Sequence, residues 1–268
     1  MTLVVGQPGT LTVVGLGPGG YQDLTHRAAE ALRHAECILG YHAYIGAVRE
    51  WLPHAAYFPS PIGAESDRCN DALDRAARGQ RVALVSSGDA GIYAMAGLVY
   101  ELAWERGWRF DGPSWPTISV VAGVTAATAA AALVGAPLMS DFASISLSDL
   151  MTPWPVIERR LHGAALGDFV VALYNPMSER RRAHLPGACA ILLAERSPAT
   201  PVAIVRQACR PGQDVLHTTL GALATTRVDM LTVIIVGNST TRLLGDRMVT
   251  PRGYPTAAKE EGSNLAHA

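Results

Sequence analysis

The chain has 268 residues, of which 49% are hydrophobic and 17% charged, and its formal net charge is -1. This composition favours a sizeable hydrophobic core over intrinsic disorder, and the length suits two ordinary domains or one large α/β unit. A near-neutral charge argues against a nucleic-acid-binding surface, which needs a cluster of basic residues. We therefore expect a folded protein with no nucleic-acid partner.

The cysteines give no sign of a metal site or of a disulfide framework. No C-x-x-C pair occurs among the four, Cys37, Cys69, Cys189 and Cys209. Reduced, buried thiols are typical of a cytoplasmic protein. No basic stretch followed by an apolar run opens the chain, so we expect no secretory signal and a cytoplasmic location.

One uncharged segment is long enough to cross a membrane. No charged residue occurs from Gly112 to Ser140. The segment is rich in alanine and contains glycine, threonine and Pro137, so its transfer into a bilayer is weakly favoured. It also divides into a strand pattern and a helix pattern. We therefore expect buried core and no membrane partner.

Short apolar runs alternate with helical patterns through the first half of the chain. The runs predict strands at 11–17 (LTVVGLG), 36–40 (ECILG), 81–87 (RVALVSS) and 117–123 (TISVVAG). Helical patterns occur at 24–35, 44–52, 65–78, 92–106 and 124–135. Strands that alternate with helices pair in parallel, with helices on both faces of the sheet. We expect a mostly parallel sheet in an N-terminal α/β domain spanning 1–130.

The second half has more strand candidates and fewer helices. Strands are expected at 141–150, 168–176, 201–209, 213–223 and 229–239, and helices at about 154–164 and 178–195. Pro211-Gly212 predicts a turn that joins two of these strands as a hairpin. We expect a mixed sheet in a C-terminal α/β domain spanning 131–268.

Gly15, Gly17 and Gly20 spell G-x-G-x-x-G behind the first predicted strand, which is the pattern of a dinucleotide-binding turn. Such a turn needs its helix to begin almost at the second glycine. Here the run PGGYQ (18–22) intervenes, and helix-compatible sequence resumes only near Asp23. The next predicted strand also ends without the acidic residue that would hold a ribose. The sequence disfavours a dinucleotide site, and a connection that binds no ligand remains the alternative.

Other strand ends have turns of the same character. SSGD (86–89) and AGVT (122–125) each follow a predicted strand and precede a helix, and Tyr174-Asn175 ends a strand of the second half. In open α/β sheets, ligands bind at the carboxyl ends of strands, where amide and carbonyl groups are exposed. Each turn alone suits a plain connection. Their coincidence predicts a ligand site in a cleft between the two domains.

Six motifs follow one another from Thr10 to about Tyr254, namely VVGLGPGG, SSGDAGIYAMA, VVAGVTAATAAAALVGAPL, VALYNP, PVAIVRQA and LTVIIVGNS. Together they resemble the tetrapyrrole (class III) S-adenosylmethionine methyltransferases. The resemblance implies two α/β domains, a mostly parallel N-terminal and a mixed C-terminal one, with the cofactor in the cleft between them. Within the family, ILGYHAYI, LYNPMSERR, VIIVGNSTTRLL and MVTPRGY are similar to the members that methylate precorrin-3B at C17.

The resemblance also implies which residues contact the cofactor, S-adenosyl-L-methionine, and its product S-adenosyl-L-homocysteine. The implied cofactor contacts are Pro18, Ser87, Gly88, Asp89, Ile92, Thr125, Ala126, Tyr174, Asn175 and Ala208. Gly17 and Gly19 would shape the substrate side of the glycine loop. This chain departs from many relatives at Ala90, where they have proline, and at Gly20, where they have an acid. The resemblance further implies a homodimer.

Methyl transfer from a sulfonium to a substrate carbon is an in-line displacement, which needs alignment and the exclusion of water but no nucleophilic side chain. The resemblance adds a ring contraction that yields precorrin-4, and this step needs proton transfers. Tyr41, His42 and Asp141 are the candidate acid/base residues. For Tyr41 and His42, a satisfied polar residue at a strand end is the alternative.

Arginine supplies nearly all of the positive charge, since Lys259 is the only lysine among 22 Lys and Arg residues. Arginine pairs bidentately with carboxylates, which suits the acetate and propionate arms of a tetrapyrrole. Arg206 and Arg252 are the predicted substrate-binding residues, and Arg180–Arg182 and Arg210 are further candidates. A compositional bias of the whole proteome would explain the general excess of arginine.

We therefore expect an S-adenosylmethionine-dependent C-methyltransferase of cobalamin (corrin ring) biosynthesis that acts on a small-molecule tetrapyrrole. Another precorrin or cobalt-precorrin methyltransferase of the same family is the nearest alternative. A dinucleotide-dependent oxidoreductase and a tetrapyrrole carrier without chemistry are alternatives from other classes. Bound dinucleotide would favour the first of these, and bound pigment without methyl transfer the second.

Overall fold

The structure is a computed structural model that describes residues 9–53, 55–110, 112 and 114–255. The chain divides into two compact units. Unit 1 comprises Met1–Ala129 and Ala208–Pro211, and unit 2 comprises Ala130–Gln207 and Gly212–Ala268. A four-residue segment from late in the chain thus belongs to unit 1.

Unit 1 is built on a five-stranded sheet in which every pairing is parallel. The strands, in the spatial order β3-β2-β4-β1-β5, are β3 (Ala56–Ser60), β2 (Cys37–Tyr41), β4 (Arg81–Ser86), β1 (Thr10–Gly15) and β5 (Thr117–Val121). The predicted parallel N-terminal sheet is confirmed. Because the strands are parallel, the carboxyl ends of β1, β4 and β5 lie at one edge, where Gly15 pairs with Ser86.

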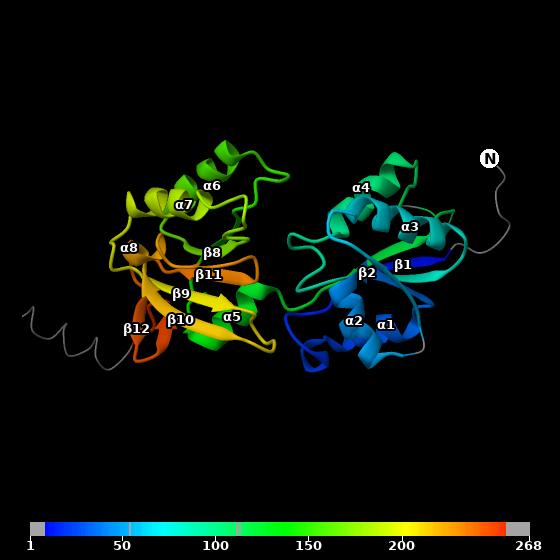
Figure 1. Ribbon diagram of the computed structural model, residues 1–268, viewed down its shortest axis with the longest axis horizontal. Helices are drawn as coiled ribbons and strands as arrows, with labels where there is room; N and C mark the ends of the chain where they lie inside the picture. The colour runs from blue at the N-terminus through cyan, green and yellow to red at the C-terminus, as the bar shows by residue number, and fades with distance from the viewer. Residues whose placement is uncertain (1–8, 54, 111, 113, 256–268) are drawn as a thin grey trace, which may run out of the picture. The chain divides into compact units, whose positions relative to one another are not determined.

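Helices cover both faces of this sheet, as Figure 1 shows. They are α1 (His26–His34), α2 (His42–Trp51), α3 (Glu65–Ala77) and α4 (Ala96–Glu105), whereas α5 (Ala126–Val134) begins in unit 1 and ends in unit 2. Successive strand residues point to opposite faces. Leu84 of β4 accordingly packs with α3 and α4, whereas Val85 packs with α1 and α2. This two-sided burial explains why the strands read as nearly continuous apolar runs.

Helix α4 begins at Ala96, four residues later than the predicted start at Ile92. The intervening residues form a turn, in which the Asp89 carboxylate accepts the Gly91 amide at 2.7 Å and the Ala96 amide donates to the Ala90 carbonyl at 3.1 Å. Tyr93 takes a φ of 52°, which a helix does not allow. Apolar periodicity cannot detect such a turn, so the predicted start was wrong.

Unit 2 contains a mixed five-stranded sheet, which confirms the predicted C-terminal fold. In the spatial order β10-β9-β11-β8-β7 its strands are β10 (Asp214–Thr219), β9 (Pro201–Arg206), β11 (Thr232–Val236), β8 (Val170–Tyr174) and β7 (Phe142–Ser146). Only β7 and β8 pair in parallel. The predicted hairpin joins β9 and β10.

The helices of unit 2 are α6 (Trp154–Leu166), α7 (His184–Leu193) and α8 (Leu220–Leu223). They pack on one core with Leu173 of β8 and Ile234 of β11. Several predicted boundaries were wrong. The strand expected to 223 ends at Thr219, just before α8, the strand expected to 150 ends at Ser146, and the helix expected from 178 begins at His184.

A small third sheet was not predicted. It contains β12 (Arg242–Leu244), β13 (Arg247–Val249) and β6 (Gly135–Ala136), in that order. A Cβ on Gly135 would lie 2.6 Å from the Met248 carbonyl oxygen, so only glycine lets these backbones approach. A two-residue strand at the end of an alanine-rich helix leaves no sequence pattern.

The uncharged stretch contains β5, a loop, α5 and, directly after α5, the two-residue strand β6. Over the residues that the structure describes, no helix combines the length and the apolar character needed to cross a membrane.

Candidate functional site

The glycine loop of unit 1 is bound directly to the loop that follows β4. The Gly17 amide donates to the Gly88 carbonyl at 3.0 Å, and the Gly88 amide donates to the Gly17 carbonyl at 2.9 Å. Both glycines have positive φ, 73° and 65°, a conformation that L side chains rarely adopt. Two loops that are far apart in sequence are therefore fixed as one rigid unit at the edge of the sheet.

The loop after β5 joins the same arrangement through a second close approach. A Cβ on Gly15 would lie 2.6 Å from the Gly88 carbonyl oxygen, and a Cβ on Gly123 would lie 2.2 Å from it. Real Cβ atoms do not come so close to backbone atoms. The glycines at these strand ends are thus required for backbone packing.

Asp89 holds the loops after β4 and β5 together. One carboxylate oxygen accepts the Gly123 amide at 3.0 Å, and the other accepts the Gly91 amide at 2.7 Å. The loops meet closely, since a Cβ placed on Gly88 would lie in van der Waals range of the backbone of Thr125 and Ala126. The predicted residues Ser87, Gly88, Asp89, Thr125 and Ala126 thus come together in unit 1.

The glycine loop lacks the geometry of a dinucleotide-binding turn. Gly20 is followed by a short 3-10 helix, Tyr21–Asp23, and α1 begins only at His26. Thr25 caps α1 by accepting the Ala28 amide at 3.1 Å. The helix N-terminus that would meet a pyrophosphate therefore starts six residues beyond Gly20, as the sequence suggested.

A pocket of about 530 Å³ lies within unit 1 beside the glycine loop. Its lining comes from the glycine loop, from α2, from Ser87 and from the segment Ala208–Pro211. Arg210 lines this pocket, and its guanidinium donates to the Pro18 carbonyl and, at 2.5 Å, to the Ser87 hydroxyl. The predicted residues Gly17 and Gly19 also line it.

Tyr44 lines the same pocket from the first turn of α2. Burial raises the pKa of its phenol, and the positive charge of Arg210 opposes this rise only in part. The phenol therefore stays protonated at neutral pH and can donate a hydrogen bond. The Tyr44 ring also meets the Tyr41 ring edge-on at 5.2 Å.

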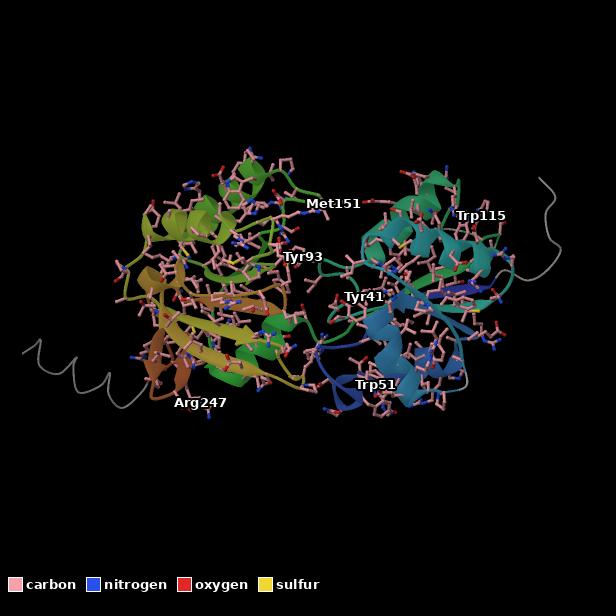
Figure 2. The ribbon with its side chains drawn as sticks, in the orientation of Figure 1. Tyr41, Trp51, Tyr93, Trp115, Met151 and Arg247 are labelled. Atoms are coloured by element: carbon pink, nitrogen blue, oxygen red, sulfur yellow. The ribbon has the colours of Figure 1, made fainter. Side chains whose placement is uncertain are left out.

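The predicted acid/base residues Tyr41 and His42 lie next to each other in unit 1. Asp141 belongs to unit 2 and lies away from the turn at Tyr174-Asn175. Tyr41 ends β2, and its ring lies 5.1 Å from that of His42. Tyr41 and Trp51 mark the two ends of α2 in Figure 2. Asp141 is exposed and precedes β7, so within unit 2 it lies at the opposite end of the sheet from Tyr174.

The polar strand ends of unit 2 are held by side-chain hydrogen bonds. Asn175 has a φ of 52°, and its amide donates to the Ser146 hydroxyl at 3.0 Å. The Leu147 amide donates to the Tyr174 carbonyl at 2.9 Å. Asparagine tolerates the left-handed conformation better than most residues, so Asn175 can turn the chain sharply after β8.

The two predicted substrate arginines differ in their surroundings. Arg206 pairs with Asp229 at 2.7 Å. Burial alone would raise the pKa of Asp229, but hydrogen bonds from Arg206, Thr232 and the Leu231 amide lower it. Arg252 is exposed beyond β13 and forms no ion pair with any residue that the structure describes.

Residues 10–224 match the sequence model of the tetrapyrrole (corrin/porphyrin) methylase family. The chain belongs to this family. As a methylase it has the two α/β domains seen in solved relatives. It superimposes on the crystal structure of the methyltransferase CobJ with a TM-score of 0.83 and 38% identity, over 91% of this chain and all of that one.

Among curated relatives, the methylase is 45% identical to a probable cobalt-factor III C(17)-methyltransferase of Salmonella typhimurium, over 91% of this chain and 99% of that one. It is 40% identical to a precorrin-3B C(17)-methyltransferase of Sinorhizobium sp, over 94% and 99%. A cobalt-factor III methyltransferase of Priestia megaterium is 43% identical over 92% of this chain, which spans only 45% of that relative's length.

Sequence reasoning missed the part of the pocket that α2 supplies, including Tyr44 and Trp51. The predicted helix began only at Tyr44, so the helical spacing between Tyr41 and Tyr44 was not recognised. Within the described ranges, no group of three His, Cys, Asp or Glu residues is arranged to hold a metal ion.

Proposed function

We propose that this methylase transfers the methyl group of S-adenosyl-L-methionine to C17 of precorrin-3B and contracts the ring to give precorrin-4, in cobalamin biosynthesis. The observation that carries the proposal is the 40% identity to a precorrin-3B C(17)-methyltransferase over 99% of its length. The whole-length match includes both units, so it covers every loop to which a role is assigned below.

The proposed cofactor contacts lie on strand-end loops. In unit 1 they are Pro18, Ser87, Gly88, Asp89, Ile92, Thr125, Ala126 and Ala208, and in unit 2 they are Tyr174 and Asn175. Two observations fit a ligand at the unit 1 edge. The buried Ser86 hydroxyl has no hydrogen-bond partner among the described residues, and the Ile92 side chain is 40% exposed. S-adenosyl-L-methionine supplies the methyl group when bound.

The rigidity of the unit 1 edge suits this reaction. In-line displacement is fastest when the reacting atoms are held in a near-attack geometry. The paired amides of Gly17 and Gly88 and the Asp89 carboxylate hold three loops against each other, so a ligand would meet a preformed surface. Asp89 therefore acts on the cofactor through loop geometry as well as through any direct contact.

The ring contraction needs a group that moves protons. We assign this role to the neighbouring residues Tyr41 and His42, with Asp141 as a third candidate. Tyr41 and His42 are supported by their place beside Tyr44, which lines the unit 1 pocket. Asp141 has no comparable support within unit 2.

A cobalt-bearing substrate is the second candidate. Two relatives named for cobalt-factor III are 43% and 45% identical to this chain, slightly more than the 40% of the precorrin-3B relative, and a third is 39% identical. The same methyl transfer would then occur on a macrocycle that already carries the metal. By resemblance to the family, we also infer a cytoplasmic homodimer.

The test is an anaerobic turnover of the full chain with S-adenosyl-L-methionine and either precorrin-3B or cobalt-factor III. We expect precorrin-3B to gain one methyl group by mass and to show the absorbance change of ring contraction. Turnover of cobalt-factor III alone would replace the proposed substrate with the second candidate. Failure with both, in protein that binds S-adenosyl-L-homocysteine, would contradict the C17 assignment.

A further inference from the structure

Among the residues that the structure describes, the unit 1 pocket has one arginine or lysine, and that group has no anionic partner. Its volume is about 530 Å³, and Arg210 is its only arginine or lysine among the described residues. No described carboxylate lies within 4.0 Å of the Arg210 guanidinium. Glu50 also lines the pocket, but it is exposed and does not pair with Arg210. A permanent positive charge thus lines the pocket without neutralisation.

The guanidinium is oriented by neutral acceptors. Its Nε donates to the Pro18 carbonyl, and Nη2 donates to the Ser87 hydroxyl at 2.5 Å. These two bonds leave further N–H groups of the planar fork for a ligand. Arg206, by contrast, already has a carboxylate partner in Asp229.

Part of the pocket lining is made of small residues. Ala43, Gly46 and Ala47 of α2 line the pocket, and a Cβ placed on Gly46 would meet no atom within 4 Å. Trp51 adds an aromatic surface, and Tyr44 adds a protonated phenol that can donate. The pocket therefore offers open space, one guanidinium and a neutral donor.

We propose that Arg210 is a substrate-positioning residue that binds a carboxylate arm of the tetrapyrrole in this pocket. This inference rests on the proposed function, because it takes a polycarboxylate macrocycle as the substrate. A carboxylate accepts two parallel N–H bonds from a guanidinium, and this pairing fixes orientation as well as position. The pocket thus holds one edge of the macrocycle beside the strand-end loops that hold the cofactor.

The kinetic test compares wild type with Arg210→Leu. Arg81→Leu is the matched control, since Arg81 begins β4 at the end away from the pocket and forms an exposed ion pair with Glu36. We expect Arg210→Leu to raise KM for the tetrapyrrole about 10- to 100-fold, the loss typical of a charge-assisted bond, with a smaller change in kcat. Arg81→Leu should leave both constants unchanged.

A second pair of variants tests the pocket without touching the guanidinium. Gly46→Phe should fill the open space and raise KM for the tetrapyrrole, whereas Gly46→Ala should have little effect. All four variants should bind S-adenosyl-L-homocysteine by calorimetry with wild-type affinity. Methylguanidinium added to an Arg210→Ala variant should restore part of the lost activity, which a merely structural residue would not show.

The outcomes separate the two proposals. If the wild-type protein methylates no tetrapyrrole, the proposed function is wrong, and so is the proposed role of Arg210. If the wild type is active and KM for the tetrapyrrole is unchanged in both Arg210→Leu and Gly46→Phe, only the proposed role of Arg210 is wrong. A loss of cofactor affinity and thermal stability in Arg210→Leu, without rescue by methylguanidinium, also overturns it and makes Arg210 a structural brace.

Discussion

Two arginines, one in each unit, line pockets but differ in how many of their hydrogen-bond donors the protein itself uses. Arg196 of unit 2 lines a pocket of about 260 Å³, is buried, and donates to the main-chain carbonyls of Gly237, Ala164 and Phe169. Arg210 of unit 1 lines a pocket of about 530 Å³ and donates to one carbonyl and one hydroxyl. The first joins three segments, whereas the second keeps donors for a ligand.

The difference teaches that arginine content alone says little about binding. Burial lowers the pKa of Arg196, and the charge of Asp168 opposes that shift. Such a residue is costly to remove because its acceptors would be left buried without donors. Arg210 lacks this three-segment role, so its loss should affect binding more than folding. The predictions below test that contrast and the backbone contacts around it.

The largest effect is expected for Arg196→Leu. The three carbonyls would lose their donor, and we expect the free energy of unfolding to fall by about 3–5 kcal/mol. Urea unfolding checks this. Arg81→Leu, which breaks an exposed ion pair with Glu36 and an exposed hydrogen bond to the His34 carbonyl, should stay within about 0.5 kcal/mol of wild type. Equal effects of the two substitutions would contradict the bracing role of Arg196.

Gly123→Ala tests the close backbone contact in unit 1. The new Cβ would lie 2.2 Å from the Gly88 carbonyl oxygen, so the loops must move apart. We expect a loss of about 2–3 kcal/mol, measured by thermal unfolding. Gly97→Ala is the control, because its Cβ meets no atom within 4 Å and it lies in α4, where alanine is favoured. A stable Gly123→Ala protein would show that the loops are not rigid.

Asp89→Asn tests the carboxylate that joins two strand-end loops. The amide can accept only one of the two backbone N–H groups, from Gly91 and Gly123. We expect a loss of about 1–2 kcal/mol in unfolding free energy. The larger substitution Asp89→Arg would also break this contact, so its effect on cofactor binding would not be separate from the fold. An unchanged stability in Asp89→Asn would mean that these hydrogen bonds contribute nothing.

The buried thiols of both units should make the protein less stable at alkaline pH. Burial raises the pKa of Cys69 in unit 1 from 9.0 to about 12, and that of Cys189 in unit 2 to about 11. Above pH 9 the unfolded chain releases these protons and the folded protein keeps them, so stability falls as pH rises toward the folded pKa. Near pH 10, we expect the unfolding free energy of Cys69→Ala to have decreased by about 1 kcal/mol less than that of wild type. If the unfolding free energy of the variant depends on pH as in wild type, the raised pKa of Cys69 is contradicted.

The smallest effect of these test substitutions is expected for Arg210→Leu, below about 1 kcal/mol, because only two acceptors lose a donor and one of them, the half-buried Ser87 hydroxyl, lines the pocket and can take water instead. Thermal unfolding beside Arg196→Leu measures the contrast directly. A loss as large as that of Arg196→Leu would remove the distinction between the two arginines.

Much of the fold was predictable because burial leaves a local pattern. The apolar runs of β1, β4 and β5 indicated a parallel sheet covered on both faces, and the alternation of Leu84 and Val85 between two cores follows from strand geometry. Helix starts were less predictable. A turn stabilised by Asp89 delays α4, and no periodicity records a side chain that accepts backbone amides.

The candidate site was predictable only in part. The glycine turns at the ends of β1, β4 and β5 were visible as motifs, and the family resemblance assigned them a role. Their direct contact, with Gly15, Gly88 and Gly123 packed backbone to backbone, was not visible. Tyr44 was missed because helical spacing indicates a shared face but not what that face lines.

The sequence by itself determined most of the larger strands and helices, the two α/β domains and the family, since each depends on residues that are near in the chain or on ordered motifs. Tertiary structure alone decided which arginine is neutralised, which is buried and which is left for a ligand. The physical reason is distance along the chain. Arg210 meets Pro18, 192 positions away, and an arginine's role depends on such partners, which local sequence cannot specify.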